Sequence, residues 1–266
     1  MVPVTPKLVA TDLDGTLVRS DGTVSAYTQG VLAALDEQDV PVVFVTGRPL
    51  RWAEDVFDHV GRHGLAVVSN GALVWDVEKR EPVLTRTIAP AVGVEVCERI
   101  RAAVPGSAFA VETLEGIALE TDFHERHPVP EGSRRGAIAE LFVEPALKLL
   151  ARHEELGYQE FWDRAAAATG DRAVITWSST SSLLEISAAG VTKATTLAVL
   201  AEQLGINPEE VVAFGDMPND IDMLTWAGTS YAMTDAHPTV RAAADRIAPS
   251  NDEDGVASVL SEIFGL

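Results

Sequence analysis

The sequence has a single cysteine, few basic residues and no long apolar run, and each scarcity excludes a class of protein. Cys97 alone can form neither a disulfide within the chain nor a cysteine-based zinc site, so we interpret it as a small apolar residue inside a helix. Only 20 lysines and arginines stand against 40 aspartates and glutamates, and the resulting net charge of −20 repels nucleic acid and anionic lipid. A nucleic-acid-binding function is therefore not expected.

Signals for membrane insertion, export and nucleotide binding are also missing. No stretch reaches the ~18 apolar residues that a membrane-spanning helix needs. Residues Met1 to Lys7 show no charged segment leading into a long apolar run, so we expect a soluble, cytoplasmic protein. Neither G-x-x-x-x-G-K nor G-x-G-x-x-G occurs, which excludes nucleotide-binding loops of those two kinds.

The remaining composition is that of an ordinary globular protein. The chain has 266 residues, of which 47% are hydrophobic and 23% charged, enough for one large domain or two modest ones. Because the surface is so acidic, a site for an anionic ligand needs its own positive charge. A metal ion or a few lysine and arginine side chains would supply it.

Short apolar runs alternate with helical patterns at both ends of the chain, which predicts an α/β core with a doubly wound parallel sheet. The predicted strands are Leu8–Thr11, Pro41–Val45, Leu65–Val68, Val211–Phe214, Ser230–Met233 and Arg246–Ala248. The predicted helices are Ser25–Gln38, Arg48–Val60, Thr192–Leu204 and Glu253–Phe264.

The middle of the chain has a different pattern and predicts a separate α+β domain inserted into the core. Glycine and proline interrupt it often, with helical patterns over Pro90–Val104 and Gly136–Glu154 and alternating runs at Phe109–Glu112 and Leu183–Ile186. We therefore expect residues 1–84 and 188–266 to form the core and residues 85–187 to form the inserted domain.

Polar side chains suited to binding and catalysis follow the predicted core strands. Ligands of a doubly wound sheet bind beyond the carboxyl ends of its strands, so we expect these side chains to converge there. They are Asp12 and Asp14 after the first strand, Thr46 after the second, Asn70 after the third, and Asp216, Asn219 and Asp220 after the strand at Val211–Phe214.

The turn after the first strand places two carboxylates side by side. Asp12 and Asp14 are two residues apart at a strand end and point the same way, and Gly15 lets the chain turn close to a ligand. One carboxylate can then act as a nucleophile while the other transfers protons. The structural alternative is an acidic turn that caps a helix.

The turn after Phe214 adds three more oxygen ligands. Pro218 suits a first helical turn, so Asn219 and Asp220 are predicted at a helix N-terminus, where capping would explain Asp220 alone. It does not explain Asp216 opposite another acidic turn. Converging carboxylates need a cation, and oxygen ligands favour Mg²⁺.

Lys193 lies in the first turn of its predicted helix, where the helix dipole disfavours a cation. A surface salt bridge is the structural alternative. Near an acidic metal site, however, the ammonium is suited to holding an anion, with the hydroxyl of Thr46 and backbone N–H groups after Asp12 as further donors. The predicted ligand is a phosphoryl group, and Arg48 lies close enough in sequence to contact it.

These motifs, in this order and spacing, resemble those of the haloacid dehalogenase-like superfamily. The matching segments are Asp12-Leu13-Asp14-Gly15-Thr16-Leu17, Thr46-Gly47-Arg48, Lys193 and Gly215-Asp216-Met217-Pro218-Asn219-Asp220. The large insert between the second and third motifs is similar to that of the Cof-type branch with its type IIB cap, which contains many sugar-phosphate phosphatases. Ser69–Ala72 and Asn251–Val256 also resemble that branch.

The resemblance implies a Rossmann-like core with an α+β cap, Mg²⁺ dependence and an aspartyl-phosphate intermediate. Asp14 is similar to the second carboxylate of phosphatases and phosphomutases, which dehalogenases lack. We therefore expect hydrolysis of a small phosphorylated metabolite, with a sugar phosphate favoured. A phosphomutase or phosphotransferase shares every motif and stays open, as does a non-catalytic module that binds a phosphometabolite.

The expected roles follow from this resemblance and from the chemistry of each side chain. Asp12 is the expected nucleophile, Asp14 the general acid and base, and Thr46 and Lys193 complete the catalytic set. Mg²⁺ is expected on the Asp12 carboxylate, the Asp14 backbone carbonyl and Asp216, with Asn219 and Asp220 behind these ligands. Residues expected to bind substrate or phosphate are Gly15, Gly47, Arg48, Asn70, Gly71 and Asn219.

Overall fold

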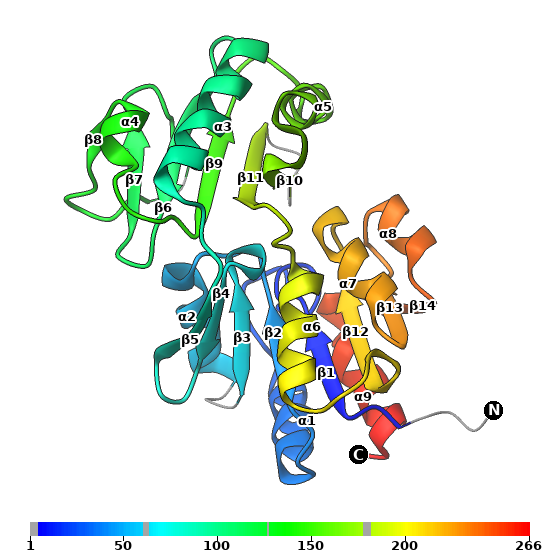
Figure 1. The fold of residues 1–266 in the computed structure, drawn as a ribbon. Helices are drawn as coiled ribbons and strands as arrows, with labels where there is room; N and C mark the ends of the chain where they lie inside the picture. The colour runs from blue at the N-terminus through cyan, green and yellow to red at the C-terminus, as the bar shows by residue number, and fades with distance from the viewer. Residues whose placement is uncertain (1–4, 61–63, 127, 178–181) are drawn as a thin grey trace. The chain divides into compact units, whose positions relative to one another are not determined.

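The computed structural model describes residues 5–60, 64–126, 128–177 and 182–266. The chain divides into two compact units (Figure 1). The core unit comprises Met1–Leu84 and Thr192–Leu266, and the cap unit comprises Thr85–Val191. The sequence analysis placed the second division after residue 187; the structure places it after Val191, beyond the last strand of the cap sheet.

The core unit contains a sheet with the order β14-β13-β12-β1-β2-β3-β4-β5. From β14 to β3 neighbouring strands are parallel, as the sequence predicts, whereas β4 runs antiparallel to β3. The strands are β1 (Leu8–Thr11), β2 (Val42–Val45), β3 (Leu65–Val68), β4 (Leu73–Asp76), β5 (Glu81–Thr85), β12 (Val211–Gly215), β13 (Thr229–Met233) and β14 (Arg246–Ala248).

Helices cover both faces of this sheet. From β1 the chain adds β2 and β3 on one side of the sheet, and β12, β13 and β14 lie on the other side. Because the connections are right-handed, the helices that join the strands of one side cover one face and those of the other side cover the opposite face. The helix α1 packs against α2 and α9, and α7 packs against α6 and α8. The helices are α1 (Ala26–Glu37), α2 (Leu50–Val60), α6 (Lys193–Gln203), α7 (Ile221–Trp226), α8 (Pro238–Ala243) and α9 (Gly255–Phe264), with short 3₁₀ turns η1 (Ser69–Gly71), η3 (Pro208–Glu210), η4 (Pro218–Asp220) and η5 (Asn251–Glu253). Among the described residues, no helix is both long and apolar enough to cross a bilayer.

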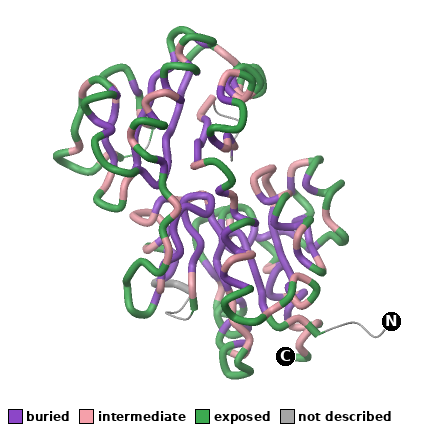
Figure 2. Tube along the Cα trace, viewed as in Figure 1, coloured by how far each residue is buried: buried purple, intermediate pink, exposed green. Residues whose placement is uncertain are grey.

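The local sequence explains why these elements form. All four residues of β1 are buried, as expected for a strand covered on both faces (Figure 2). The helix α1 begins where the Ser25 side chain accepts a hydrogen bond from the Thr28 amide, and it buries Val31, Leu32 and Leu35 along one stripe. Burial of such stripes against an apolar sheet stabilises the core unit.

The cap unit is an α+β domain with a sheet of order β10-β11-β9-β6-β7-β8. Its strands pair antiparallel except for β7 and β8, and α3 packs against α5 and α4. Its apolar core includes Phe123, Leu119 and Leu150. The elements are α3 (Pro90–Ala103), β6 (Ala108–Glu112), β7 (Ile117–Glu120), β8 (Arg135–Gly136), α4 (Ile138–Leu141), β9 (Lys148–Arg152), α5 (Tyr158–Thr169), η2 (Gly170–Arg172), β10 (Ala173–Thr176) and β11 (Leu183–Ala188).

The predicted long helix at Gly136–Glu154 is wrong. In the structure α4 spans only Ile138–Leu141, and Lys148–Arg152 forms β9 between β6 and β11. The periodicity of a short apolar run does not distinguish a buried strand from a helix. Pairing with β6 and β11 therefore determines that this segment is a strand. Lys148 of β9 is buried between Glu112 of β6 at 3.8 Å and Glu185 of β11 at 3.5 Å, contacts that a strand allows.

Candidate active site

The carboxyl ends of β1, β2, β3 and β12 meet at the point where the strand order reverses. Strand β1 lies between β12 and β2, and the amide of Asp12 continues the sheet by donating to the Phe214 carbonyl at 3.0 Å. In the same way the amide of Thr46 donates to Val67 at 2.8 Å. The loops that carry the candidate residues are thereby brought to one edge of the sheet, where ligands of such sheets bind.

A buried lysine joins two aspartates at this edge. The Lys193 ammonium donates to Asp12 Oδ1 at 2.7 Å and to Asp220 Oδ1 at 2.6 Å. Lys193 is the first residue of α6, which begins where the Thr192 side chain accepts a hydrogen bond from the Thr195 amide. Only 2% of Lys193 and 5% of Asp12 are exposed, so water does little to screen the attraction between them.

Asp220 is fully satisfied by its protein partners. Its second oxygen, Oδ2, accepts hydrogen bonds from the amides of Asp216 at 3.1 Å and Met217 at 3.0 Å. With Lys193 on the other oxygen, the carboxylate of Asp220 links the start of α6 to the turn after β12. This arrangement orients Lys193 and shapes the turn that carries Asp216.

Burial and mutual repulsion change the protonation of these groups. Burial raises the pKa of Asp12 well above its ordinary value, the attraction of Lys193 opposes this, and Asp220, Asp216 and Asp14 raise it further. Burial, together with repulsion by Asp220, raises the pKa of Asp216 to about 7. Burial would lower the pKa of Lys193, but the attraction of Asp12 and Asp220 outweighs it and the pKa is raised. The Lys193 ammonium therefore stays charged. The carboxylates around it carry more negative charge than this one ammonium neutralises.

The acidic cluster has the ligand chemistry of a divalent cation site. One oxygen from each of Asp12, Asp216 and Asp220 lies within 4.8 Å of the others. Asp216 Oδ1 accepts a hydrogen bond from the Thr16 hydroxyl at 2.9 Å, while Asp216 Oδ2 and Asp12 Oδ2 accept none from the described residues. Two available carboxylate oxygens in a charge-deficient pocket fit a hard cation such as Mg²⁺.

Gly15 allows the two acidic turns to approach each other. Its φ is +74°, in the left-handed region, and a Cβ atom built on it would lie 2.4 Å from Asp216 Oδ2. A side chain at this position would displace the Asp216 carboxylate. The sequence predicts that Gly15 brings the backbone close to a ligand; in the structure its close neighbour is the Asp216 carboxylate.

Asp14 and Arg48 form an ion pair at the exposed side of the cluster. Arg48 Nε donates to Asp14 Oδ2 at 2.7 Å and Arg48 Nη2 donates to Asp14 Oδ1 at 2.6 Å, a bidentate geometry. The Asp14 side chain is 57% exposed and that of Arg48 24% exposed. The sequence analysis expected Arg48 near a phosphate and gave no indication that it pairs with Asp14.

The other predicted binding residues lie in the loops after β2, β3 and β12. The Thr46 hydroxyl oxygen accepts a hydrogen bond from the Arg48 amide at 3.0 Å, and its own proton has no acceptor among the described residues. The Asn219 side chain donates to Asn70 Oδ1 at 3.1 Å, and the buried Oδ1 of Asn219 has no partner in the described part of the chain. Gly47 lies half-buried between Thr46 and Arg48.

Gly71 lies against the start of α6. Its φ is +101°, and an added Cβ would lie 2.3 Å from the Thr192 carbonyl oxygen. The preceding Asn70 also has a left-handed backbone, with φ of +55°. The turn after β3 is thus shaped to fit closely against the residue that precedes Lys193.

Comparison with known proteins identifies the family. A family model described as haloacid dehalogenase-like hydrolase matches residues 9–260. The chain belongs to this family. Over 270 residues it is 27% identical to 5-amino-6-(5-phospho-D-ribitylamino)uracil phosphatase YitU of Bacillus subtilis, with 98% of each chain covered. The predicted enzyme class, a phosphoric monoester hydrolase, is confirmed.

Solved structures share the fold of this haloacid dehalogenase-like hydrolase. SMU.1108c from Streptococcus mutans superposes with a TM-score of 0.85 at 26% identity, covering 98% of this chain and 100% of that one. The HAD subclass IIB sugar phosphatase BT4131 gives a TM-score of 0.80 at 21% identity, covering 97% and 99%. The predicted Rossmann-like core with an inserted α+β cap is therefore confirmed as the fold.

A second set of contacts, which the sequence analysis gave no role, ties the end of the chain to the segment after Asp14. Arg19 donates to Asp254 through Nη2 at 2.6 Å and Nε at 3.1 Å, and Asn251 donates to the Val18 carbonyl at 2.8 Å. The signal was the Asn251–Val256 segment, which resembles the family. In this hydrolase the segment holds the chain that follows the first motif.

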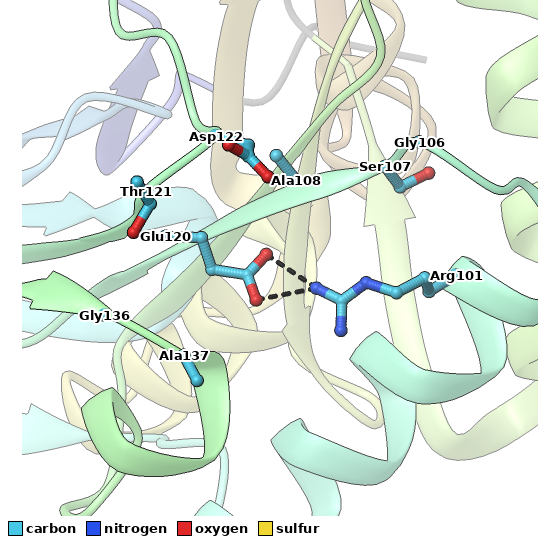
Figure 3. A pocket seen from close by; sticks show the side chains of 9 residues that line it. All are labelled: Arg101, Gly106, Ser107, Ala108, Glu120, Thr121, Asp122, Gly136 and Ala137. Atoms are coloured by element: carbon cyan, nitrogen blue, oxygen red, sulfur yellow. Dashed lines mark hydrogen bonds and ion pairs between the residues drawn. The ribbon is translucent and has the colours of Figure 1, made fainter.

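The cap unit of the hydrolase contains a pocket of about 510 Å³ whose lining includes Arg101, Ser107, Glu120 and Asp122 (Figure 3). Glu120 accepts hydrogen bonds from Arg101 at 2.6 Å, from the Phe109 amide at 2.9 Å and from the Ile138 amide at 3.3 Å. The carboxylate thus joins α3, β6 and the start of α4, which is a structural role within the cap.

Proposed function

We propose that the protein is a Mg²⁺-dependent phosphatase that hydrolyses a small phosphorylated metabolite, of the sugar-phosphate class, through an aspartyl phosphate on Asp12. The observation that carries this proposal is the buried Asp12 carboxylate, held through one oxygen by Lys193 at 2.7 Å while its other oxygen accepts no hydrogen bond from the described residues. Such a carboxylate is oriented, buried and able to attack the phosphorus.

The first step forms a bond between a carboxylate oxygen of Asp12 and the phosphorus, and breaks the bond between phosphorus and the ester oxygen of the substrate. Asp14, in its protonated form, gives its proton to that departing oxygen. The leaving group then departs as an alcohol, and the phosphoryl group remains on Asp12.

The second step returns the enzyme to its starting state. The Asp14 carboxylate takes a proton from a water molecule as the water oxygen attacks the phosphorus of the aspartyl phosphate. The bond between Asp12 and phosphorus breaks, and inorganic phosphate is released. Asp14 therefore acts as acid in the first step and as base in the second.

Mg²⁺ would be held by the Asp12 carboxylate, the Asp14 backbone carbonyl and Asp216, with Asn219 and Asp220 behind these ligands. The two available oxygens on Asp12 and Asp216 support this assignment. When bound, the ion supplies positive charge that offsets repulsion between the attacking carboxylate and the phosphoryl oxygens. Lys193 supplies the rest of that charge.

The phosphoryl group is bound by donors from the same loops. The Thr46 hydroxyl has a proton to donate, and Arg48 supplies a guanidinium. Asn219 and Asn70 complete the set through their linked side chains. The full set is Gly15, Thr46, Gly47, Arg48, Asn70, Gly71, Lys193 and Asn219.

The sugar-phosphate class is supported by the relative YitU, whose name gives its substrate as a phosphorylated ribitylamino pyrimidine. We assign discrimination among leaving groups to the cap unit, because the chemistry resides in the core unit. A phosphotransferase would differ only in the acceptor of the second step. Product analysis with a sugar present separates transfer to the sugar from release of inorganic phosphate.

The test is turnover of a panel of phosphorylated sugars, nucleotides and cofactors, measured as phosphate release with Mg²⁺ and again with EDTA. We expect the highest kcat/KM among sugar phosphates and loss of turnover in EDTA. Full activity in EDTA would contradict the metal assignment, and preference for a nucleotide or cofactor would contradict the substrate class.

A further inference from the structure

The Arg48 guanidinium is held at each of its three nitrogens. Nε and Nη2 donate to the two carboxylate oxygens of Asp14 at 2.7 and 2.6 Å, and Nη1 donates to the Trp52 carbonyl at 3.1 Å. The amide of Arg48 also donates to the Thr46 hydroxyl at 3.0 Å. Nη1 thus anchors the guanidinium to α2, the backbone amide of Arg48 is held by Thr46 in the loop after β2, and the Nε–Nη2 edge is occupied by Asp14.

This pairing conflicts with what the chemistry asks of the two side chains. A general acid must present a carboxyl oxygen to the leaving group, but both oxygens of Asp14 are engaged by Arg48. A phosphate-binding arginine must present its fork to the phosphoryl oxygens, but that fork is occupied by Asp14. In the conformation observed, each residue prevents the other from performing its proposed role.

Resting on the proposed function, we propose that the substrate phosphoryl group takes the place of Asp14 on Arg48 and that the released Asp14 then turns to the leaving oxygen. Arg48 is a positioning residue for Asp14 before substrate binds and a phosphate ligand once substrate is bound. Binding of the correct anion thereby prepares the general acid.

The energies of the competing contacts favour this exchange. The ion pair is partly exposed, so breaking it costs less than breaking a buried pair. A phosphoryl dianion accepts the same bidentate fork with greater charge than a carboxylate. The hydrogen bond from Nη1 to the Trp52 carbonyl does not involve Asp14, so it keeps the guanidinium in place while its anionic partner changes.

The test is a double-mutant cycle with inorganic phosphate as the probe and Mg²⁺ present, read by calorimetry rather than by turnover. Asp14→Asn should tighten phosphate binding by about fivefold, because the competing carboxylate is gone. In that Asp14→Asn background, adding Arg48→Ala should weaken binding by about tenfold or more, because a charge-assisted contact is lost. In the presence of Asp14, Arg48→Ala should cost distinctly less.

The opposite pattern would overturn the exchange. If Arg48 only screens or anchors Asp14, Arg48→Ala weakens phosphate binding when Asp14 is present and changes nothing in the Asp14→Asn background. Arg48→Gln provides a second variant that keeps a hydrogen-bonding side chain but removes the charge, and unfolding temperatures establish that each variant is folded. A crystal structure with Mg²⁺ and phosphate gives the direct reading: Arg48 bonded to phosphate supports the exchange, and Arg48 still bonded to Asp14 refutes it.

Failure of the proposed function gives a different result. A folded wild-type protein that binds no phosphate with Mg²⁺ present contradicts the phosphatase site itself. Phosphate binding by the wild type without dependence on Arg48 in the Asp14→Asn background contradicts the exchange alone.

Discussion

Lys193 Nζ lies 2.7 Å from Asp12 Oδ1, although the two residues are 181 positions apart in the chain. The same ammonium contacts Asp220, so one positive charge serves two buried carboxylates while Asp216 adds a third close by. The protein by itself leaves this cluster negative. A divalent cation would supply the missing positive charge, and so would favour both the stability of the site and the approach of a phosphate ester.

The first prediction concerns Lys193. Lys193→Met should lower kcat/KM by about a hundredfold or more, as for other preorganised electrostatic contacts. It should also lower the unfolding temperature, because two buried carboxylates lose their counter-ion. Lys193→Arg should restore little activity, since a planar fork does not replace a compact ammonium. Steady-state kinetics and thermal unfolding test this, and wild-type kinetics in Lys193→Met would contradict it.

The convergence of the site could be predicted from the sequence because it depends on topology alone. Once buried strands end at Thr11, Val45 and Phe214, the polar residues after them must share one edge of a parallel sheet. The Asp14–Arg48 pair could not be predicted in this way. It depends on rotamers and on the direction of side chains from two loops, and neither leaves a periodic signal.

The fold was predictable where periodicity and length agree. The core strands β1, β2 and β3 are short, apolar and followed by polar turns, and they lie where the sequence predicts. Strand β9 is not predictable from its own residues, because its charged ends, Lys148 and Arg152, fit an exposed helix as well as a strand. Both are buried in the cap sheet, where Lys148 has carboxylates on the neighbouring strands. Tertiary pairing of this kind overrides local pattern.

The second prediction tests the close approach at Gly15. Gly15→Ala should abolish most Mg²⁺-dependent turnover, because the new methyl group would displace the Asp216 carboxylate, 2.4 Å from its position. Gly22→Ala is the matched control: Gly22 has a similar φ of +83°, but apart from its chain neighbours no heavy atom of the described residues lies within 4 Å of the added Cβ. Both variants bear the same backbone strain, so equal activity in the two would contradict a specific contact with Asp216.

The third prediction concerns the pH dependence of stability without metal. The folded-state pKa of Asp216 is raised from its ordinary value of 3.8 to about 7. The folded protein therefore retains a proton that the unfolded chain has lost, and stability falls as pH rises from about 4 through 7. In EDTA above pH 7, Asp216→Asn should unfold at a higher temperature than the wild type, because the repulsion among carboxylates is relieved.

Added Mg²⁺ should reverse that order by raising the unfolding temperature of the wild type more than that of Asp216→Asn. Asp222→Asn is the control, since Asp222 is an exposed carboxylate on the neighbouring helix α7. It should follow the wild type with and without Mg²⁺. An Asp216→Asn protein that gains as much from Mg²⁺ as the wild type would contradict the metal assignment.

The last prediction separates the two aspartates of the first motif. Asp12→Asn should remove turnover altogether, since an amide cannot form the acyl phosphate. Asp14→Asn should cost about a hundred- to ten-thousandfold, the usual contribution of general acid–base catalysis. The loss should shrink for an aryl phosphate, because its leaving group departs without a proton.

With an aryl phosphate, Asp14→Asn retains the first step but lacks the base for the second, so the phosphorylated enzyme should accumulate. Rapid-quench mass spectrometry should then find a phosphate adduct on the peptide that contains Asp12, which is buried against Lys193 and therefore oriented for attack. Asp14, whose side chain is 57% exposed and paired with Arg48, lacks the contact with Lys193 that orients Asp12. A phosphate adduct on another peptide, or a burst of aryl alcohol with no adduct, would contradict these roles.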